Sequence, residues 1–259
     1  MSKPVLSIIT INYNNLEGLK ATHQSVIAQD VRRTDFEWLV IDGGSTDDSK
    51  AYVESINEHI DHWVSEPDKG IYDAMNKGIT MAKGDYLWFL NRGDRFHHTK
   101  SLQDVLSAIE QNPKADVFFG DTDFVDEKYQ SMGLISEMKP QKFPEKITKS
   151  SFRFGMNICH QSIVVRAALS PKYNLDYKQA SDIDWILNVL ELNPVTHKVP
   201  GVLSDFQMGG SSTENSRKAI KERYEIFKNH FGFLPNILAH VWIVIRRVLF
   251  NLKGRSGAA

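Results

Sequence analysis

The chain has 259 residues, of which 41% are apolar and 24% are charged, and its formal net charge is −1. This length allows one large α/β domain, or one domain with an appendage, and the composition is ordinary for a soluble globular protein. The balanced charge gives no global field for nucleic acid, and the single cysteine, Cys159, excludes an intramolecular disulfide and a cysteine-rich zinc site. The N-terminus shows no signal-peptide pattern, so we expect a cytoplasmic protein.

The first 120 residues alternate between buried strands and helices. Strands are expected at 5–11, 36–41, 62–65, 86–90 and 115–120, with helices between them at 16–29, 51–60, 71–82 and 99–111. Because this alternation is typical of βαβ units, we predict an α/β fold with a mainly parallel, doubly wound sheet flanked by helices.

The pattern is weaker after Asp121. We expect a hairpin within 124–139, a polar loop over 140–157, a strand at 158–165 and a helix at 182–192. Short strands at 195–199 and 202–206 should precede a charged helix at 214–231 and an apolar segment at 234–252. No repeat and no flexible linker divides the chain.

Two predicted strands lead directly into a carboxylate and a glycine-containing turn. Asp42 precedes Gly43-Gly44, and Asp94 follows Gly93. Acidic strand ends in an α/β sheet suit a nucleotide diphosphate and Mg²⁺ or Mn²⁺, because hard cations take oxygen ligands. Either aspartate alone could be an ordinary turn residue, but the two together favour a shared site.

Three further segments each allow a functional and a structural interpretation. Asp182 and Asp184 open a predicted helix, where one could be a general base or both could cap the helix, and the residues alone favour capping. Gly209-Gly210 could cover a phosphate with backbone N–H groups or form a plain loop. His160 is more typical of a structural histidine than of a catalyst.

Taken together, these motifs resemble family 2 glycosyltransferases with the GT-A fold, a Rossmann-like fold. The matching segments are 7–14, 40–47, 84–94 and 181–182, and the resemblance covers about residues 4–212. The blocks at 65–78 and 208–212 are similar to bacterial exopolysaccharide enzymes of the colanic-acid type. The resemblance implies a GT-A catalytic domain over 1–212, with a nucleotide-sugar half at about 1–121 and an acceptor half at about 122–212, followed by a helical extension over 213–259.

The resemblance also implies roles for individual residues. It places the following residues around the donor: Thr10, Tyr13, Asp42, Glu66, Asn91, Gly93, Gly209 and Gly210. Among them Tyr13 offers a stacking face, and Asp42 can accept a hydrogen bond from the base. Asp94 is similar to the last acid of the family's metal motif. Asp182 matches the expected catalytic base, with Asp184 as its nearest rival.

The chain departs from the family pattern at two places. Asn91-Arg92-Gly93 stands where the metal motif has its first acid, so we expect Asp94 to be the only carboxylate that coordinates the metal. Ser181 replaces the usual glutamate before Asp182. The Gln-x-x-Arg-Trp motif of processive relatives is absent, which favours transfer of one sugar per acceptor.

We therefore expect an inverting enzyme that uses Mg²⁺ or Mn²⁺ and a UDP- or GDP-linked sugar. Its acceptor would be a hydroxyl of a glycan, such as one linked to polyprenyl diphosphate, in bacterial surface polysaccharide synthesis. The alternative is a nucleotide-sugar-binding or scaffolding protein that has lost catalysis. A nucleotidyltransferase or dehydrogenase is disfavoured because the chain has neither a Gly-x-Gly-x-x-Gly motif nor a Walker motif.

The segment 234–252 has apolar residues at three- and four-residue steps, and a basic rim at 228, 246, 247, 253 and 255. Arg246 and Arg247 disfavour a spanning helix. We expect 234–255 either to lie in the plane of the cytoplasmic face of the inner membrane, or to pack on the catalytic domain or on a partner in a homo-oligomer.

Overall fold

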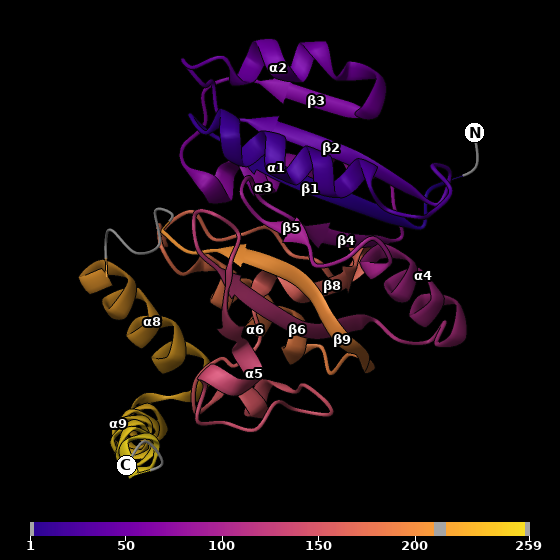
Figure 1. Ribbon diagram of the computed structural model, residues 1–259. Coiled ribbons are helices and arrows are strands. Elements are labelled where there is room, and N and C mark those ends of the chain that lie inside the picture. Colours follow the sequence, from indigo (N-terminus) through magenta and orange to yellow (C-terminus); the bar gives the residue numbers. More distant parts are fainter. Residues whose placement is uncertain (1–2, 210–215, 257–259) are drawn as a thin grey trace.

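A computed structural model describes residues 3–209 and 216–256 and shows a curled mixed sheet flanked by helices (Figure 1). The strands are β1 (Leu6–Asn12), β2 (Phe36–Asp42), β3 (His62–Ser65), β4 (Tyr86–Phe89), β5 (Arg95–Phe96), β6 (Val117–Val125), β7 (Ser131–Leu134), β8 (Ile163–Arg166) and β9 (Thr196–Gln207). The helices are α1 (Leu16–Ile27), α2 (Ser49–Ser55), α3 (Ile71–Met81), α4 (Ser101–Gln111), α5 (Ile135–Met138), α6 (Ser181–Glu191), α8 (Ser216–Phe231) and α9 (Phe233–Ser256). The predicted α/β fold class is confirmed.

The N-terminal part of the sheet is parallel, as the alternation predicted. β2 pairs with β1 and β3, and β1 pairs with β4, all in parallel register. Every residue of β1, β2 and β4 is buried. Helices α1, α2 and α4 cover one face of the sheet and α3 and α6 cover the other. This two-sided burial explains why these strands read as continuous apolar runs rather than alternating ones.

The second half of the sheet is mixed, whereas a mainly parallel sheet was predicted. β8 lies between β4 and β6 and runs antiparallel to both, so β6 does not pair with β4. The two short strands expected at 195–199 and 202–206 form one strand, β9, which turns at Gly201 with a φ of +90° and shifts its register against β6. The two-residue strand β5, which pairs with β9, was not predicted.

The hairpin expected within 124–139 is formed by β6 and β7, and α5 follows it directly. The segment expected as a polar loop, 140–157, contains a short 3₁₀ helix at Lys149–Phe152 and contributes Ile147 and Phe152 to the core. The predicted border at 121/122 between the two halves of the domain falls inside β6.

The C-terminal helices lie at the edge of the molecule. α8 packs against α6, and α9 packs mainly against α8. Figure 1 shows α9 end-on, clear of the sheet. Gly232, with a φ of +86°, separates the two helices. The arrangement leaves most of α9 without a protein neighbour among the described residues.

Candidate active site

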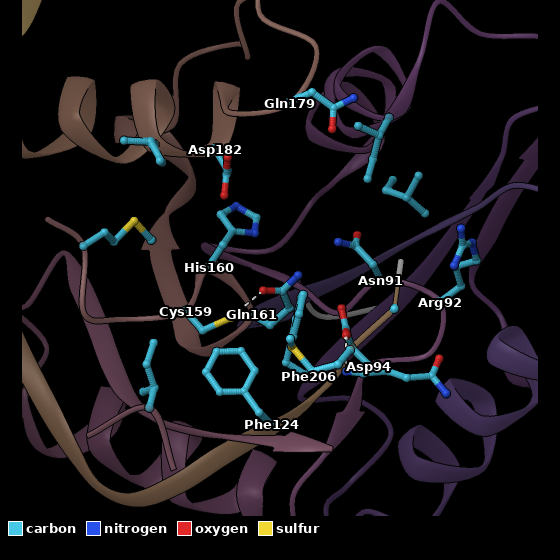
Figure 2. A pocket seen from close by; sticks show the side chains of 18 of the residues that line it. Asn91, Arg92, Asp94, Phe124, Cys159, His160, Gln161, Gln179, Asp182 and Phe206 are labelled. Atoms are coloured by element: carbon cyan, nitrogen blue, oxygen red, sulfur yellow. Dashed lines mark hydrogen bonds between the residues drawn. The ribbon is translucent and has the colours of Figure 1, made fainter. Parts of the chain in front are cut away.

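A cleft of about 2230 Å³ begins where β1, β2 and β4 end and reaches α8 and α9. Its first end is formed by residues that follow the parallel strands, including Tyr13, Gly43, Asn91 and Asp94. Figure 2 shows Asp94 and Asp182 on opposite sides of this cavity, with His160 and Gln161 between them. The cleft therefore brings the two sequence-predicted acids, Asp94 and Asp182, to one space.

The loop after β1 presents an aromatic face to the cleft. The Tyr13 side chain is 55% exposed and lies against Gly43. A Cβ at Gly43 would stand 2.4 Å from the Asp68 carboxylate and 3.4 Å from the Tyr13 ring, so any other residue would displace the Asp68 side chain from this position. Asp68 also lines the cleft, and sequence reasoning did not single it out although it stands within the matched block at 65–78.

Asp42 ends β2 but turns away from the cleft. Its carboxylate accepts hydrogen bonds from Asn12 Nδ2 at 2.7 Å, from both the backbone N–H and the hydroxyl of Ser45, and from Ser65 Oγ at 2.7 Å. Burial would raise the pKa of Asp42, but these hydrogen bonds outweigh it and hold the pKa below its ordinary value. The ionised carboxylate thus fixes the loop that carries Gly43.

Two other residues that the resemblance places around the sugar donor, Thr10 and Glu66, do not reach the cleft. The Thr10 side chain is fully buried, where it donates to Leu90 O at 2.8 Å and accepts from Trp38 Nε1 at 3.0 Å. The Glu66 carboxylate forms a 2.8 Å ion pair with Lys77. Neither side chain is among the described residues that line the cavity. Thr10 instead stabilises the strands that it joins by hydrogen bonds, and Glu66 stabilises its own loop through the ion pair.

The turn after β4 directs Asp94 into the cleft. Gly93 has a φ of +87° and faces Gln207, whose backbone N–H stands 3.3 Å from Asp94 Oδ1. Gly93 itself shapes the turn and does not line the cavity. Burial raises the pKa of Asp94 to about 8, although hydrogen bonds from Gln207 and Gln161 and the charge of Arg92 act in the opposite direction.

The same turn offers a second oxygen. Asn91 is 9% exposed and lines the cleft, and its buried Oδ1 has no hydrogen-bond partner among the described residues. A carboxylate and an orphaned amide oxygen are both hard ligands of the kind that Mg²⁺ and Mn²⁺ prefer. Asn91 and Asp94 therefore fit a divalent cation that keeps further positions for a diphosphate and water.

A second group of metal-ligating side chains lies beside this turn. His97, Asp123 and Asp205 have ligand atoms within 4.8 Å of one another. However, Asp205 already binds Arg95 at 2.7 Å and His97 Nδ1 at 2.7 Å. The hydrogen bond to Asp205 raises the pKa of His97. Arg95 and His97 thus already occupy both oxygens of the Asp205 carboxylate, and this group does not line the cleft.

Asp182 stands in the first turn of α6 and faces the cleft. Tyr72 from α3 donates a 3.1 Å hydrogen bond to Asp182 Oδ1. Burial, and secondly the charge of Asp182, raise the pKa of the Tyr72 phenol well above its ordinary value, so the phenol stays protonated and remains a donor. The Asp182 carboxylate is therefore held in one orientation while it stays accessible from the cavity.

Asp184 points elsewhere. Its Oδ1 pairs with His230 Nε2 of α8 at 2.9 Å, and its Oδ2 accepts from Asn188 at 3.2 Å. Asp184 is not among the described residues that line the cleft. The helical rotation of about 100° per residue separates the two acids, because it turns Asp184 from the cavity toward α8.

Aromatic side chains support Tyr72 and Asp182 from behind. Tyr173 stacks between Tyr72 and Trp185, at centroid distances of 5.5 Å and 5.2 Å. The Tyr173 hydroxyl pairs with His160 Nε2 at 2.7 Å, and burial lowers the pKa of His160. His160 thus has the structural surroundings that the sequence favoured, although its ring also borders the cleft.

Later segments of the chain form the rest of the cleft. Gly209, with a φ of +103°, lines it, whereas Gly210 lies outside the described residues. α8 and α9 form the far end of the cleft with Ile220, Arg223, Phe227, Ile243, Arg246 and Phe250. Sequence analysis assigned none of these helical residues to the site, because their place depends on how two helices dock.

The sequence model of glycosyl transferase family 2 matches residues 7–170 of this chain. An uncharacterized glycosyltransferase of Mycobacterium tuberculosis is 34% identical over 226 residues, which cover 85% of this chain and 81% of the relative. A glycosyltransferase of PGL/p-HBAD biosynthesis from Mycobacterium bovis is 30% identical over 234 residues, which cover 86% and 85%. The family match includes Tyr13, Asn91 and Asp94 and ends before Asp182.

Solved structures share the fold. TarS residues 1–349 of S. aureus superposes with a TM-score of 0.68 at 17% identity, over 87% of this chain and 64% of TarS 1–349, so the chain spans less than two thirds of that protein. A mannosyltransferase of Pyrobaculum calidifontis, solved with GDP-Man and Mn²⁺, gives a TM-score of 0.66 at 16% identity, over 93% and 70%. At these identities the likeness establishes the fold alone.

Proposed function

Because the chain belongs to glycosyltransferase family 2, we propose that it moves one sugar, with inversion, from a nucleotide-diphosphate sugar to an acceptor hydroxyl. The observation that carries this proposal is the oriented carboxylate of Asp182, which shares one cleft with Tyr13 and Asp94. One end of the cleft offers a stacking surface and oxygen ligands. The other end offers a base and an extended groove.

The donor would occupy the first end of the cleft. The exposed ring of Tyr13 can stack on the nucleobase, and Asp68 can accept hydrogen bonds from the nucleoside. Asp42 would act through its hydrogen bonds to Ser45 and Ser65, which hold the loop in place. TarS has been solved with UDP and with UDP-GlcNAc, and the Pyrobaculum enzyme with GDP-Man, so UDP- and GDP-linked donors are the first to test.

Asp94 and Asn91 would hold Mg²⁺ or Mn²⁺ at the diphosphate. The bound cation would stabilise the negative charge that develops on the leaving diphosphate. Arg92 lines the same end of the cleft and would add a positive side chain of the protein beside the diphosphate. Gly209 could contribute a backbone N–H near the phosphates.

Asp182 would act as the general base. As the acceptor oxygen attacks the anomeric carbon, its proton passes to the Asp182 carboxylate while the bond from that carbon to the diphosphate oxygen breaks. The products are the glycosylated acceptor and a nucleoside diphosphate. Tyr72 would keep the accepting oxygen in line by its hydrogen bond. A single displacement of this kind inverts the anomeric configuration.

For the acceptor we propose a lipid-linked glycan of the colanic-acid or a similar surface polysaccharide pathway, glycosylated at the cytoplasmic face of the inner membrane. The support is the apolar helix α9, which borders the far end of the cleft. The incomplete acidic motif at Asn91 is the only feature that favours an inactive binding protein, and the family relatives, which are named glycosyltransferases, do not favour it.

The test begins with thermal-shift binding of UDP, GDP and their sugars in the presence of Mn²⁺. The bound donor is then incubated with the full chain and a membrane extract that supplies acceptors. We expect acceptor-dependent release of nucleoside diphosphate and a product of inverted configuration by NMR. Nucleotide binding without any acceptor-dependent release would support the inactive binding protein instead.

A further inference from the structure

The side chains of α9 are distributed in the opposite way to those of a surface helix on a soluble protein, with apolar residues outside and polar residues inside. Nine of its apolar side chains are between 45% and 70% exposed: Phe233, Leu234, Leu238, Val241, Trp242, Val244, Ile245, Val248 and Leu249. Its described polar side chains instead face the protein. Asn236 Nδ2 donates to Tyr224 O at 3.2 Å, the His240 ring packs on Tyr224, and Arg246 Nη2 donates to Phe154 O at 2.7 Å.

The exposed apolar surface of α9 is too broad to be covered by one partner helix. At 100° per residue, the nine exposed side chains cover an arc of about 180°, whereas a coiled-coil partner needs only the narrower stripe of a and d positions. The segment Phe233–Phe250 is long and apolar enough to cross a membrane, and only 12% of it is buried. The acyl chains of a lipid bilayer would cover the whole arc, whereas one partner helix would cover only part of it.

The protein-facing side of α9 is part of the cleft that contains Asp182. Ile243, Arg246 and Phe250 line this far end, together with Arg223 and Ile220 of α8. Arg223 makes no hydrogen bond or ion pair with the described residues, and the buried Arg246 Nε has no hydrogen-bond partner there. Two guanidinium groups among apolar side chains suit a phosphate joined to an alkyl chain.

We propose that α9 lies in the bilayer with its outer arc among the acyl chains, and that the cleft takes its acceptor from the lipid beside α9. The acceptor would be a lipid phosphate that carries the glycan, with its phosphate at Arg223 and Arg246 and its sugar at Asp182. The reacting hydroxyl then reaches Asp182 while the alkyl chain stays in the membrane. The role of the acceptor rests on the proposed function, whereas the burial of α9 in lipid does not.

Trp242 reports the position of α9 directly, because it lies on the outer arc and is 48% exposed. The full chain is mixed with uncharged phosphatidylcholine vesicles whose acyl chains carry bromine. We expect quenching of Trp fluorescence that disappears in Trp242→Phe. A lack of quenching, together with a dimer in sedimentation experiments, would show that a second copy covers the arc and would overturn the proposal.

A charge on the outer arc provides the second test. Leu238→Glu with Val244→Glu should abolish flotation with the same vesicles, since both side chains are more than 60% exposed and point away from the protein. Leu192→Glu is the matched control, because Leu192 is an apolar residue with 60% exposure after α6 and should leave flotation intact. Equal flotation of both variants would contradict the proposal.

The phosphate site is tested with Arg223→Gln. We expect the KM for a lipid-phosphate acceptor to rise about tenfold, which corresponds to ~1.4 kcal/mol, while the KM for a soluble glycan without phosphate does not change. Inorganic phosphate is added as a competitor of the lipid-phosphate acceptor, to distinguish a site for the lipid headgroup from a site for phosphate in general. An equal change for both acceptors would refute the phosphate contact. If the wild type has no transferase activity, the proposed function fails, yet quenching and flotation still decide where α9 lies.

Discussion

Tyr72 on α3 donates its hydroxyl to Asp182 at the start of α6, across 110 residues of sequence and a distance of 3.1 Å. This hydrogen bond joins α3, which follows the cleft-lining segment with Asp68, to the proposed catalytic base. Tyr173 stacks on the Tyr72 ring and limits its movement. The pair therefore links the two ends of the cleft through one partly buried contact.

Tyr72→Phe removes this hydrogen bond while it keeps the aromatic packing. Because a hydrogen bond to a charged group contributes ~1.5–3 kcal/mol, we expect kcat to fall about 10- to 100-fold. The KM for the donor should change little, because Tyr13 and Asp94 are untouched. Steady-state kinetics with varied donor and acceptor measure this difference, and a rise in donor KM with unchanged kcat would contradict a positioning role.

Tyr13→Ala should weaken nucleotide binding. Stacking of a base on an aromatic ring contributes ~1–3 kcal/mol per base, so we expect the Kd for the nucleoside diphosphate to rise roughly 5- to 150-fold. Tyr13→Phe keeps the ring and should bind almost normally. Isothermal calorimetry compares the three proteins, and equal affinities for all three would exclude stacking on this residue.

Removal of divalent cations should stop turnover, and Mn²⁺ or Mg²⁺ should restore it. Asp94→Asn should raise the cation concentration needed for half-maximal activity by at least tenfold, because the only carboxylate among the proposed ligands is lost. Asp205→Asn is the comparison, since Asp205 belongs to the neighbouring group with His97 and Asp123. If Asp205→Asn has the larger effect on this requirement, the cation is bound by that neighbouring group and not at Asp94.

The contact between α6 and α8 should depend on pH through His230. Burial acts to lower the pKa of His230, but hydrogen bonds to Asp184 and Glu191 outweigh it and raise the pKa above 6.5. The stabilisation is therefore complete below pH 6.5 and decreases as the pH rises through the folded-state value. We expect Tm to fall over this interval.

His230→Gln should remove that pH dependence and, near pH 6, lower the stability by about 2 kcal/mol, or roughly 4–8 °C in Tm. His98→Gln, at an exposed histidine, is the control and should keep the wild-type profile. Differential scanning fluorimetry between pH 5 and pH 8.5 measures all three proteins. A wild-type profile that stays flat would show that His230 does not stabilise the α6–α8 contact.

The parallel half of the fold could be predicted from sequence because its signals are local. Each of β1, β2 and β4 is a continuous apolar run, and the helices between them are bounded by turn residues such as Asn15 and Gly84. The place of β8 could not be predicted in this way. Its insertion between β4 and β6 depends on pairing between residues 44–48 and 76–80 positions apart, which no local pattern encodes.

The site was predictable to the extent that it lies at strand ends. Tyr13, Asn91 and Asp94 follow buried strands and do reach the cleft, and Asp182 joins them at a helix start. Asp42 follows the same rule but turns inward, since Asn12, Ser45 and Ser65 supply it with donors. Such competition among nearby polar groups is decided by three-dimensional geometry and not by spacing.

The C-terminal helix shows the same limit. Its apolar spacing predicted one apolar face with a basic rim, and a helix is present at Phe233–Ser256. The direction of that face depends on which side packs on α8. The inward position of Asn236 and Arg246 leaves the apolar side exposed, and this exposure supports the proposal that α9 contacts lipid.

The central claim is that Asp182, and not Asp184, removes the acceptor proton. The most direct measurement is the turnover number of Asp182→Asn beside Asp184→Asn, with nucleotide binding as the control for folding. We predict that Asp182→Asn loses turnover by at least a thousandfold, within the roughly 10²–10⁴-fold that general base catalysis supplies, and still binds nucleotide. Asp184→Asn should keep most of its turnover, because Asp184 pairs with His230 outside the cleft. Near-normal turnover of Asp182→Asn would contradict the account.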